Sequence, residues 1–321
     1  MKTIKDTIHQ LTLPTPYAVG DVHCYLLEGE QLTLIDAGVK TEEAWEAMKL
    51  QLDQINITPD QIEQVALTHH HPDHMGLVQH FPNIKKVAGH PFLKPWYEQN
   101  EQFFIEYENF FRQMYIESGV PEDFFYILKT LKKPLKWTSS GELHEELTEG
   151  SFLSGHEEWK VIETPGHAQS HISFFRECDG ALIGGDHLLA HISSNPLLEP
   201  PQTVHTTRPR PLLQYRDSMK KLLNYNIKKV YPGHGEVFND IDSLITQRLK
   251  HQELRAAKVL KLLEEGEKSA FQVCERLFPK HIHSQFGLTM SETIGQLDYL
   301  EEKGHISNNF LGERKYYYVN R

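Results

Sequence analysis

The feature that most constrains the fold of this chain is a unit that recurs five times: a short apolar segment, a turn and an ionisable side chain. The side chains that end these units are Asp36, His69, His167, Asp186 and His234. Four of the five turns contain glycine, which lets the backbone turn sharply and approach its neighbours closely. Because ligands of α/β proteins gather outside the carboxyl ends of strands, the pattern predicts an α/β fold whose strand ends meet at one site.

The second unit is the richest in metal-ligating side chains. Residues 68–76 read Thr-His-His-His-Pro-Asp-His-Met-Gly, and four ligand-type side chains fall within six positions: His69, His71, Asp73 and His74. His69 and His71 are two positions apart, so an extended segment points them the same way. Imidazole nitrogen and carboxylate oxygen together suit zinc or a similar divalent ion. A histidine tag is the alternative, but a tag would stand at a terminus and would not contain Pro and Asp.

In this order the residues resemble the metal motifs of the metallo-β-lactamase superfamily, over roughly residues 10–245. The resemblance implies an αβ/βα sandwich whose strand ends hold two divalent ions. It implies one group of three ligands for each ion: His69, His71 and His167, then Asp73, His74 and His234. Asp186 would bridge the two ions.

The resemblance also implies residues that support the ligands. Asp36 would lie behind the site and orient the ligand loop. His171 and His187 would orient ligands or donate a proton. The complete set is similar to the glyoxalase II, lactonase and RNA-processing branches, whereas the antibiotic-hydrolysing enzymes differ in part of it. β-Lactams are therefore disfavoured as substrates.

The ligand set predicts hydrolysis by a pair of metal ions. Two cations a few ångströms apart lower the pKa of a bridging water from about 15.7 to about 7, so hydroxide exists near neutral pH. The hydroxide would attack a carbonyl carbon or phosphorus, with Asp73 guiding the proton. The other residues assigned to catalysis are His69, His71 and His74. Zinc suits these donors best, with iron and manganese as alternatives.

Three functions remain open on the sequence alone. The first is a hydrolase of a small ester, thioester or lactone, which the net charge of −11 favours. The second is a phosphodiesterase or endoribonuclease, although a nucleic-acid partner is disfavoured because binding to phosphates calls for a positive field. The third is a metal-bound regulator without turnover, which the intact ligand set disfavours.

Composition predicts a globular protein of the cytoplasm. Apolar residues make up 39% of the chain, mean hydropathy is −0.50, and no apolar run reaches the roughly 18 residues that a membrane helix needs. Three widely spaced cysteines, an odd number, fit a reducing compartment. The first nine residues lack the apolar core of a signal peptide. We therefore expect a small-molecule substrate and no membrane partner.

Residues 92–137 interrupt the alternation of strands and helices. They hold 13 of the 33 aromatic residues, and the spacing of the rings predicts an inserted helical pair. The rings would pack the insert onto its host, form an apolar lid over the metal cleft, or make a homodimer contact. In a lid, Phe104 and Phe111 would bind substrate. Arg208 would hold a substrate anion or lie on a plain surface loop.

The segment from about residue 246 onward changes character. Three helical patterns precede a predicted hairpin around residues 308–312, an order that resembles a winged helix. Thr289 and Glu292 form a capping-box pattern that is expected to open the third helix. That helix is acidic, so we expect a structural or dimerising role rather than nucleic-acid recognition. The same layout resembles a branch that includes an endoribonuclease, which keeps that function open. The predicted domains are a catalytic domain, residues 1–245, and a winged-helix-like α+β domain, residues 246–321.

Overall fold

The structure is a computed structural model that describes residues 7–202 and 207–321. Contacts between residues divide the chain into two compact units. Unit 1 contains residues 1–100, 133–194 and 221–241, and unit 2 contains residues 101–132, 195–220 and 242–321. Much of the region predicted as an insertion therefore groups with the tail, and the division is not a single cut near residue 245. Residues 1–6, on which part of the signal-peptide expectation rests, lie outside the described residues.

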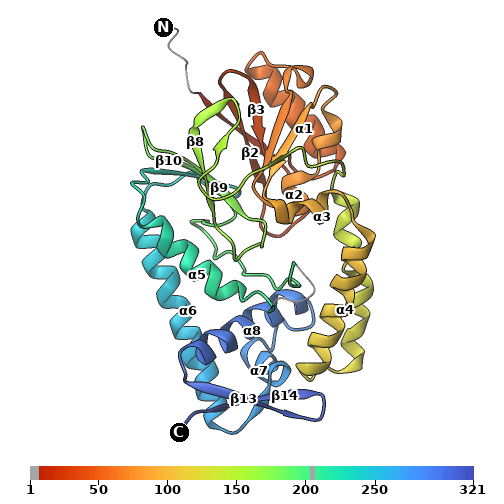
Figure 1. Cartoon of the computed structure of the whole chain (residues 1–321), viewed down its shortest axis with the longest axis vertical. Helices are drawn as coiled ribbons and strands as arrows, with labels where there is room; N and C mark the ends of the chain where they lie inside the picture. The colour runs from red at the N-terminus through yellow and green to blue at the C-terminus, as the bar shows by residue number, and fades with distance from the viewer. Residues whose placement is uncertain (1–6, 203–206) are drawn as a thin grey trace. The chain divides into compact units, whose positions relative to one another are not determined.

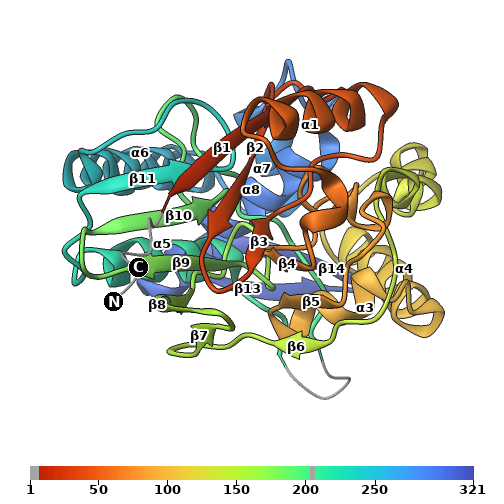
Figure 2. The same ribbon diagram turned by 90° about the horizontal axis from the view of Figure 1, so that it is seen from above.

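Two sheets form the centre of unit 1, and Figure 2 shows their strands. The first sheet has the order β1-β2-β3-β4-β5-β6, antiparallel from β1 to β3 and parallel from β3 to β6. Its strands are β1 (Ile8–Leu13), β2 (Val22–Glu28), β3 (Leu32–Ile35), β4 (Gln64–Leu67), β5 (Lys86–Gly89) and β6 (Glu145–Glu146). Parallel β3 and β4 bring the residues that follow them, Asp36 and Thr68, to the same edge.

The second sheet has the order β11-β10-β9-β8-β7. Only β10 and β11 are parallel, and the other pairs are antiparallel. Its strands are β7 (Phe152–Leu153), β8 (His156–Glu163), β9 (Ile172–Arg176), β10 (Ala181–Gly185) and β11 (Lys229–Pro232). The parallel pair again places two ligand-type residues, Asp186 and His234, beyond the carboxyl ends of neighbouring strands.

The core of unit 1 joins the two sheets. Tyr25 and Ile35 from the first sheet cluster with Trp159 and Phe174 from the second, and all four are at most 2% exposed. This apolar layer is what a two-sheet sandwich needs in order to bury the inner face of each sheet. The expected α/β sandwich is confirmed.

Helices in unit 1 are few and mostly short. The longest, α1 (Glu42–Gln54), packs against β1 and buries Ala44, Met48 and Leu52, which recur every four positions. Thr41 caps it by accepting a hydrogen bond from the Ala44 amide at 3.2 Å. The others are η1 (Pro59–Gln61), α2 (Pro72–Met75), η2 (Val78–His80), η3 (Pro91–Leu93), α3 (Lys94–Tyr97) and η5 (Lys133–Trp137).

Unit 2 combines helices with a small sheet of order β12-β14-β13. Figure 1 shows α7 and α8 beside the β13–β14 hairpin. The elements of the tail are α6 (Ile241–Glu264), β12 (Lys268–Ser269), α7 (Ala270–Leu277), α8 (Phe286–Glu302), β13 (Ile306–Leu311) and β14 (Arg314–Val319). The elements before it are α4 (Glu101–Glu117), η4 (Glu122–Thr130) and α5 (Pro211–Leu222), the last of which runs across the unit boundary.

The aromatic residues of α4 and η4 pack onto the tail within unit 2. The ring of Phe286 lies 5.2 Å from that of Tyr115 and 4.8 Å from that of Phe124, measured between centroids. Phe124 also meets Phe271 at 5.3 Å. Phe111 belongs to the same buried cluster. Plain packing therefore accounts for many of these rings, whereas the lid and the dimer contact stay predictions.

The expected start of the third helix of the tail is wrong. α8 begins at Phe286, so Thr289 lies inside the helix, and its hydroxyl donates to the carbonyl of Gln285 at 3.1 Å instead of capping. The capping box belongs to α7, where Ser269 accepts from the Gln272 amide at 3.3 Å and Gln272 accepts from the Ser269 amide. Within the described ranges, no helix has the length and apolar character to cross a membrane.

Candidate metal centre

Seven side chains that end strands or occupy the loop after β4 converge in unit 1. They form three overlapping groups, in each of which the ligand atoms lie within 4.8 Å of one another. The groups are His69, His71 and His167; His69, His74 and Asp186; and Asp73, His74 and His234. These are the seven residues predicted as metal ligands. The structure thus brings together a set that spans 166 positions of the chain, from His69 to His234.

The first group presents three imidazole nitrogens to one point. His71 Nδ1 lies 2.9 Å from His69 Nε2 and 2.9 Å from His167 Nε2. α2 begins directly after His71, so its first residue, Pro72, sets the turn that separates this group from Asp73 and His74. The rings of His69 and His71 meet edge-on at 4.5 Å. Three nitrogens at this spacing describe one face of a coordination polyhedron.

The second group combines imidazole and carboxylate. His234 Nε2 lies 3.3 Å from Asp73 Oδ2 and 3.4 Å from Asp186 Oδ2, while His74 Nε2 lies 3.4 Å from Asp186 Oδ1. Asp186 also reaches toward the first group, with Oδ2 at 3.6 Å from His167 Nε2. Its two oxygens therefore face both groups.

These donors fit a divalent metal. Within the described residues, buried His74 Nε2, His234 Nε2 and Asp186 Oδ1 have no hydrogen-bond partner, although buried polar atoms normally have one. Metal–nitrogen bonds of 2.0–2.1 Å in a tetrahedron separate ligand atoms by about 3.3 Å. The separations of 3.3 and 3.4 Å in the second group agree with this value. The site is therefore one in which a cation, rather than a hydrogen bond, would satisfy the inward-facing atoms.

The outward-facing nitrogens of His69, His74 and His167 have oxygen partners. His74 Nδ1 donates to Asp36 Oδ2 at 2.8 Å, and His69 Nδ1 donates to Thr68 Oγ1 at 3.0 Å. His167 Nδ1 contacts Ser194 Oγ at 3.1 Å. These contacts fix the rings so that Nε2 faces the ion. The resemblance implies that Asp36 orients the ligand loop, and its hydrogen bond with His74 is a contact of that kind.

Asp36 also holds the start of the ligand loop. Its Oδ1 accepts from the Thr68 amide at 2.7 Å and its Oδ2 accepts from the Thr68 hydroxyl at 2.8 Å. Its backbone has φ of +60°, which is uncommon outside glycine and is typical of strained functional positions. The Asp36 carboxylate therefore fixes both the backbone at the start of the ligand loop and the orientation of the His74 ring.

Three supporting contacts were not predicted from the sequence. Ser194 Oγ accepts from His167 and donates to the Asp186 carbonyl, and thereby joins the two groups. His234 Nδ1 donates to the Asp21 carbonyl at 2.7 Å. The sequence signal for Thr68 is its position directly before the histidines. Neither Ser194 nor Asp21 lies in a recognisable pattern, because their contacts join loops that are distant in the chain.

His171 supports the bridge through the backbone. Its Nε2 accepts from the Asp186 amide at 3.1 Å, so the ring proton lies on Nδ1, which contacts Thr164 Oγ1 at 2.8 Å. His187 is fully buried, with its ring 6.0 Å from that of His171. Neither belongs to a ligand group among the described residues. His70 turns away from the ligands, stacks on Trp96 at 4.0 Å and contacts Ser170 Oγ at 2.8 Å.

Glycine at position 233 makes room for the bridging carboxylate. A Cβ at Gly233 would lie 2.2 Å from Asp186 Oδ1 and 2.9 Å from His74 Cε1. Neither atom can retreat without leaving the ligand cluster. The Pro-Gly turn before His234 is therefore required by the packing of the site as well as by the turn itself.

Charge distinguishes the two ligand groups. Burial lowers the pKa of His69 well below its ordinary value, and the neighbouring His74 and His71 lower it further. Burial acts the same way on His234, but the carboxylate of Asp186 outweighs it and raises the pKa of His234 to about 10. Burial favours a raised pKa for Asp186, yet His234 and His74 hold it well below the ordinary value. The second group therefore attracts positive charge, while the first offers neutral imidazoles.

The residues predicted to bind substrate all belong to unit 2. Phe104 and Phe111 are buried, at 4% and 7% exposed, and Lys132 lies 5.7 Å from the centroid of the Phe104 ring. Arg208 pairs with Asp298. Their contribution to substrate binding stays a prediction.

A cavity in unit 1 lies beside His234 of the second group. It has a volume of about 460 Å³, and its lining includes Asp21, His23, His191 and Gly235. His23 Nε2 donates to the Gly235 carbonyl at 2.7 Å. Burial lowers the pKa of His23, so its ring is neutral at pH 7. The volume and the polar lining suit a small molecule.

Comparison with known proteins supports one family. Residues 17–234 match the family described as "Metallo-beta-lactamase superfamily". The chain is 42% identical over 315 residues to "Probable metallo-hydrolase YqjP" of Bacillus subtilis (strain 168), a match that covers 98% of both chains. It is similar to the crystal structure of a metallo-beta-lactamase family protein, TTHA1429, of Thermus thermophilus, with a TM-score of 0.82, 28% identity and 98% of both chains covered.

A shorter match has a more specific name. "Atrochrysone carboxyl ACP thioesterase dmxR1" of Cryptosporiopsis sp. (strain 8999) is 29% identical over 106 residues, which cover 33% of this chain and 29% of that protein.

Proposed function

The chain belongs to the metallo-beta-lactamase superfamily and is a metal-dependent hydrolase, and we propose that it holds two divalent ions and cleaves a small ester, thioester or lactone. The overlap of the ligand groups carries this proposal. His69 and His74 each stand in two groups, and Asp186 reaches both sides, with Oδ1 near His74 and Oδ2 between His167 and His234. Seven donors exceed the four that a single zinc ion takes in proteins, so two neighbouring ions account for the set.

Each residue of the centre has a defined task in this proposal. When bound, a pair of divalent ions supplies hydroxide near neutral pH and polarises the bond to be cleaved. Asp36, Thr68 and Ser194 orient the ligating rings through their Nδ1 atoms. Asp73 receives the proton of the attacking water and directs it to the leaving group. Zinc is the proposed ion because the donors are imidazole and carboxylate, with iron and manganese as alternatives.

The cavity beside His234 supports a small-molecule substrate. It adjoins the second ligand group through Gly235, and its lining offers the side chains of His23, His191 and Asp21 for hydrogen bonds. The partial match to a named ACP thioesterase adds thioesters to the classes to be assayed first. We propose the cytoplasm as the compartment, because all three cysteines are free.

A phosphodiesterase or endoribonuclease is the second candidate, and the topology of the tail favours it. The tail consists of a helix, a short strand, two helices and a hairpin, with the sheet order β12-β14-β13, an arrangement that resembles a winged helix. We propose that this module is structural or dimerising. Its third helix, α8, is the one that would enter a nucleic-acid groove.

Contacts of α8 within unit 2 oppose that use. Ser291 accepts at Oγ from the Leu198 amide at 3.2 Å, and Asp298 pairs with Arg208. A Cβ at Gly295 would lie 2.8 Å from the side chain of Leu212. Leu198, Arg208 and the start of α5 therefore cover α8, and the helix would have to be uncovered before it could reach a groove.

A substrate panel tests the proposed function. One metal-replete preparation of the full chain would be assayed on acyl thioesters, lactones, simple esters and bis-aryl phosphodiesters, with a metal-stripped sample as control. We expect turnover on at least one carbonyl class that disappears when the metal is removed. Metal-dependent turnover of the phosphodiester alone would replace this proposal with the second candidate.

A further inference from the structure

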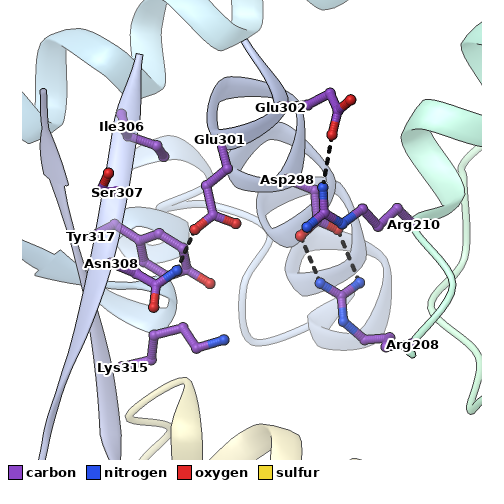
Figure 3. A pocket seen from close by; sticks show the side chains of 10 residues that line it. All are labelled: Arg208, Arg210, Asp298, Glu301, Glu302, Ile306, Ser307, Asn308, Lys315 and Tyr317. Carbon is purple, nitrogen blue, oxygen red and sulfur yellow. Dashed lines mark hydrogen bonds and ion pairs between the residues drawn. The ribbon is translucent and has the colours of Figure 1, made fainter. Parts of the chain in front are cut away.

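A polar cavity of about 580 Å³ lies within unit 2, and Figure 3 shows the side chains around it. Three parts of the unit form its walls: the segment before α5, the last turns of α8, and one face of the β13–β14 hairpin. None of its lining residues belongs to the metal ligand groups among the described residues. The volume falls within the range of about 300–1,000 Å³ that is typical of small-molecule sites.

Two arginines on one wall are already neutralised. The Arg208 guanidinium donates to both carboxylate oxygens of Asp298, at 2.9 and 2.6 Å, in a bidentate pair. Arg210 donates to Glu302 at 3.1 Å. These four charges cancel in pairs. They give the wall a fixed shape but leave little net charge for a ligand.

The other charges of the lining are Glu301 and Lys315. The Asn308 amide donates to the Glu301 carboxylate, but that contact does not cancel its charge. Lys315 lies over the ring of Phe310, with Nζ 5.3 Å from the centroid. In the part of the chain that the structure describes, neither Glu301 nor Lys315 forms an ion pair. The cavity therefore holds one unpaired anion and one unpaired cation.

Tyr317 adds a neutral donor beside Lys315. The two residues are two positions apart on β14 and share a face of the hairpin, where Asn308 stands opposite Tyr317. Tyr317 is 6% exposed, and burial, reinforced by Asp298 and Glu301, raises its pKa, so the hydroxyl keeps its proton. Among the described residues its hydroxyl has no hydrogen-bond partner. The hydroxyl oxygen itself is reached from the cavity, so it can donate to an oxygen atom of a ligand.

We propose that this cavity binds a free α-amino acid, with Lys315 and the Tyr317 hydroxyl holding its carboxylate and Glu301 holding its ammonium group. A simple anion would be repelled by Glu301, and a simple cation would be repelled by Lys315. A ligand that carries both charges uses both side chains. Figure 3 shows Lys315 and Glu301 directed toward the same space, on the side of the hairpin that faces α8.

Calorimetric titration of the full chain with each of the twenty standard amino acids tests this site. We expect at least one to bind with Kd below about 1 mM at neutral pH. Its N-acetyl form lacks the ammonium group and its amide form lacks the carboxylate. Each should therefore bind at least about tenfold more weakly. These comparisons use the unmodified protein, so they do not depend on the folding of a variant.

Variants then assign the two charges. Lys315→Met and Glu301→Gln keep the size of each side chain, and each should weaken binding at least about tenfold, while Tyr317→Phe should weaken it severalfold. Lys303→Met and Glu313→Gln are the matched controls, because both residues are exposed and lie outside the lining. Four results would overturn the site: no amino acid binds with Kd below about 10 mM, the N-acetyl form binds as tightly as the free amino acid, inorganic phosphate binds more tightly, or the variants bind as wild type.

Discussion

The two units use their buried side chains in different ways. In unit 1 the interior at the strand ends is polar: His69, His74 and Asp186 are buried and are held by hydrogen bonds to neighbouring loops. In unit 2 the interior of α4, η4 and the tail is built from rings, such as Phe124 and Phe286, that touch one another. A change at the centre should therefore alter metal content and turnover with the fold retained. A change in the ring cluster should lower stability and leave the ligands in place.

The largest effect is expected for Asp186→Asn. The side chain keeps its size but loses the charge that faces both ligand groups. Loss of a contact behind a metal ligand typically lowers metal affinity or activity by about 10–100-fold, so loss of the charge that faces both groups should lower turnover by more than about a hundredfold. Steady-state assays on the substrate found in the panel measure this fall, and elemental analysis should show that one ion is lost.

Asp217→Asn is the matched control for that variant. Asp217 is an exposed aspartate whose side chain is 76% accessible and pairs with Lys220. It should keep wild-type turnover and metal content. Wild-type rates in Asp186→Asn would mean that the bridging role is assigned to the wrong residue.

Phe286→Ala should have the next largest effect, on stability. The ring is 3% exposed and contacts Tyr115, Phe124 and Phe271. Truncating a buried phenylalanine to alanine costs about 3–5 kcal/mol in the free energy of unfolding. Denaturant titration would measure the loss, with Tyr126→Ala as control because Tyr126 is 57% exposed. Loss of metal from the folded variant would contradict the contrast between the two units.

Asp36→Asn should weaken metal binding without unfolding the chain. Asparagine tolerates the positive φ of this position, so the backbone cost is small. It removes the charged acceptor for His74 Nδ1, and loss of such outer contacts typically lowers metal affinity about 10–100-fold. Competition with a chelator of known affinity measures the change. Unaltered affinity would show that Asp36 does not orient His74.

Ser194→Ala should give the smallest effect of the series. It removes a neutral contact to His167 and leaves the carboxylates of the site intact. A single neutral hydrogen bond is worth about 0.5–1.5 kcal/mol, so metal affinity should fall by roughly two- to tenfold. The same chelator competition measures it. A loss larger than that of Asp36→Asn would reverse the order of importance argued here.

The convergence of the seven candidate ligands was predictable because their sequence signal is local. His69, His71, Asp73 and His74 are close in sequence, and His167, Asp186 and His234 each follow an apolar strand and a glycine turn. Strand ends at one edge of a sandwich must meet, so the sequence pattern leads to the cluster by topology alone. The α/β sandwich was predictable for the same reason.

The contacts that support the candidate ligands and the grouping of α4 with the tail could not be predicted, because they join segments that are distant in the sequence. Nothing near Ser194 or Asp21 in the sequence indicates that they hold His167 and His234. The grouping of α4 with the tail depends on ring contacts between residues more than 100 positions apart, such as Tyr115 with Phe286. The start of α8 was misjudged because Thr289 and Glu292 match a capping box, whereas the hydroxyl of Thr289 bonds within the helix. A local sequence pattern cannot distinguish a threonine that caps a helix from one whose hydroxyl bonds within the helix.

Whether the seven side chains hold two ions is decided by the number of metal ions per chain. The full-length protein would be stripped with a chelator, reloaded with zinc, iron or manganese, freed of excess ion and measured by elemental analysis alongside activity. We expect close to two ions per chain and activity that rises as the second ion is added. One ion per chain, reproducibly, with no gain in activity when more metal is supplied, would contradict it.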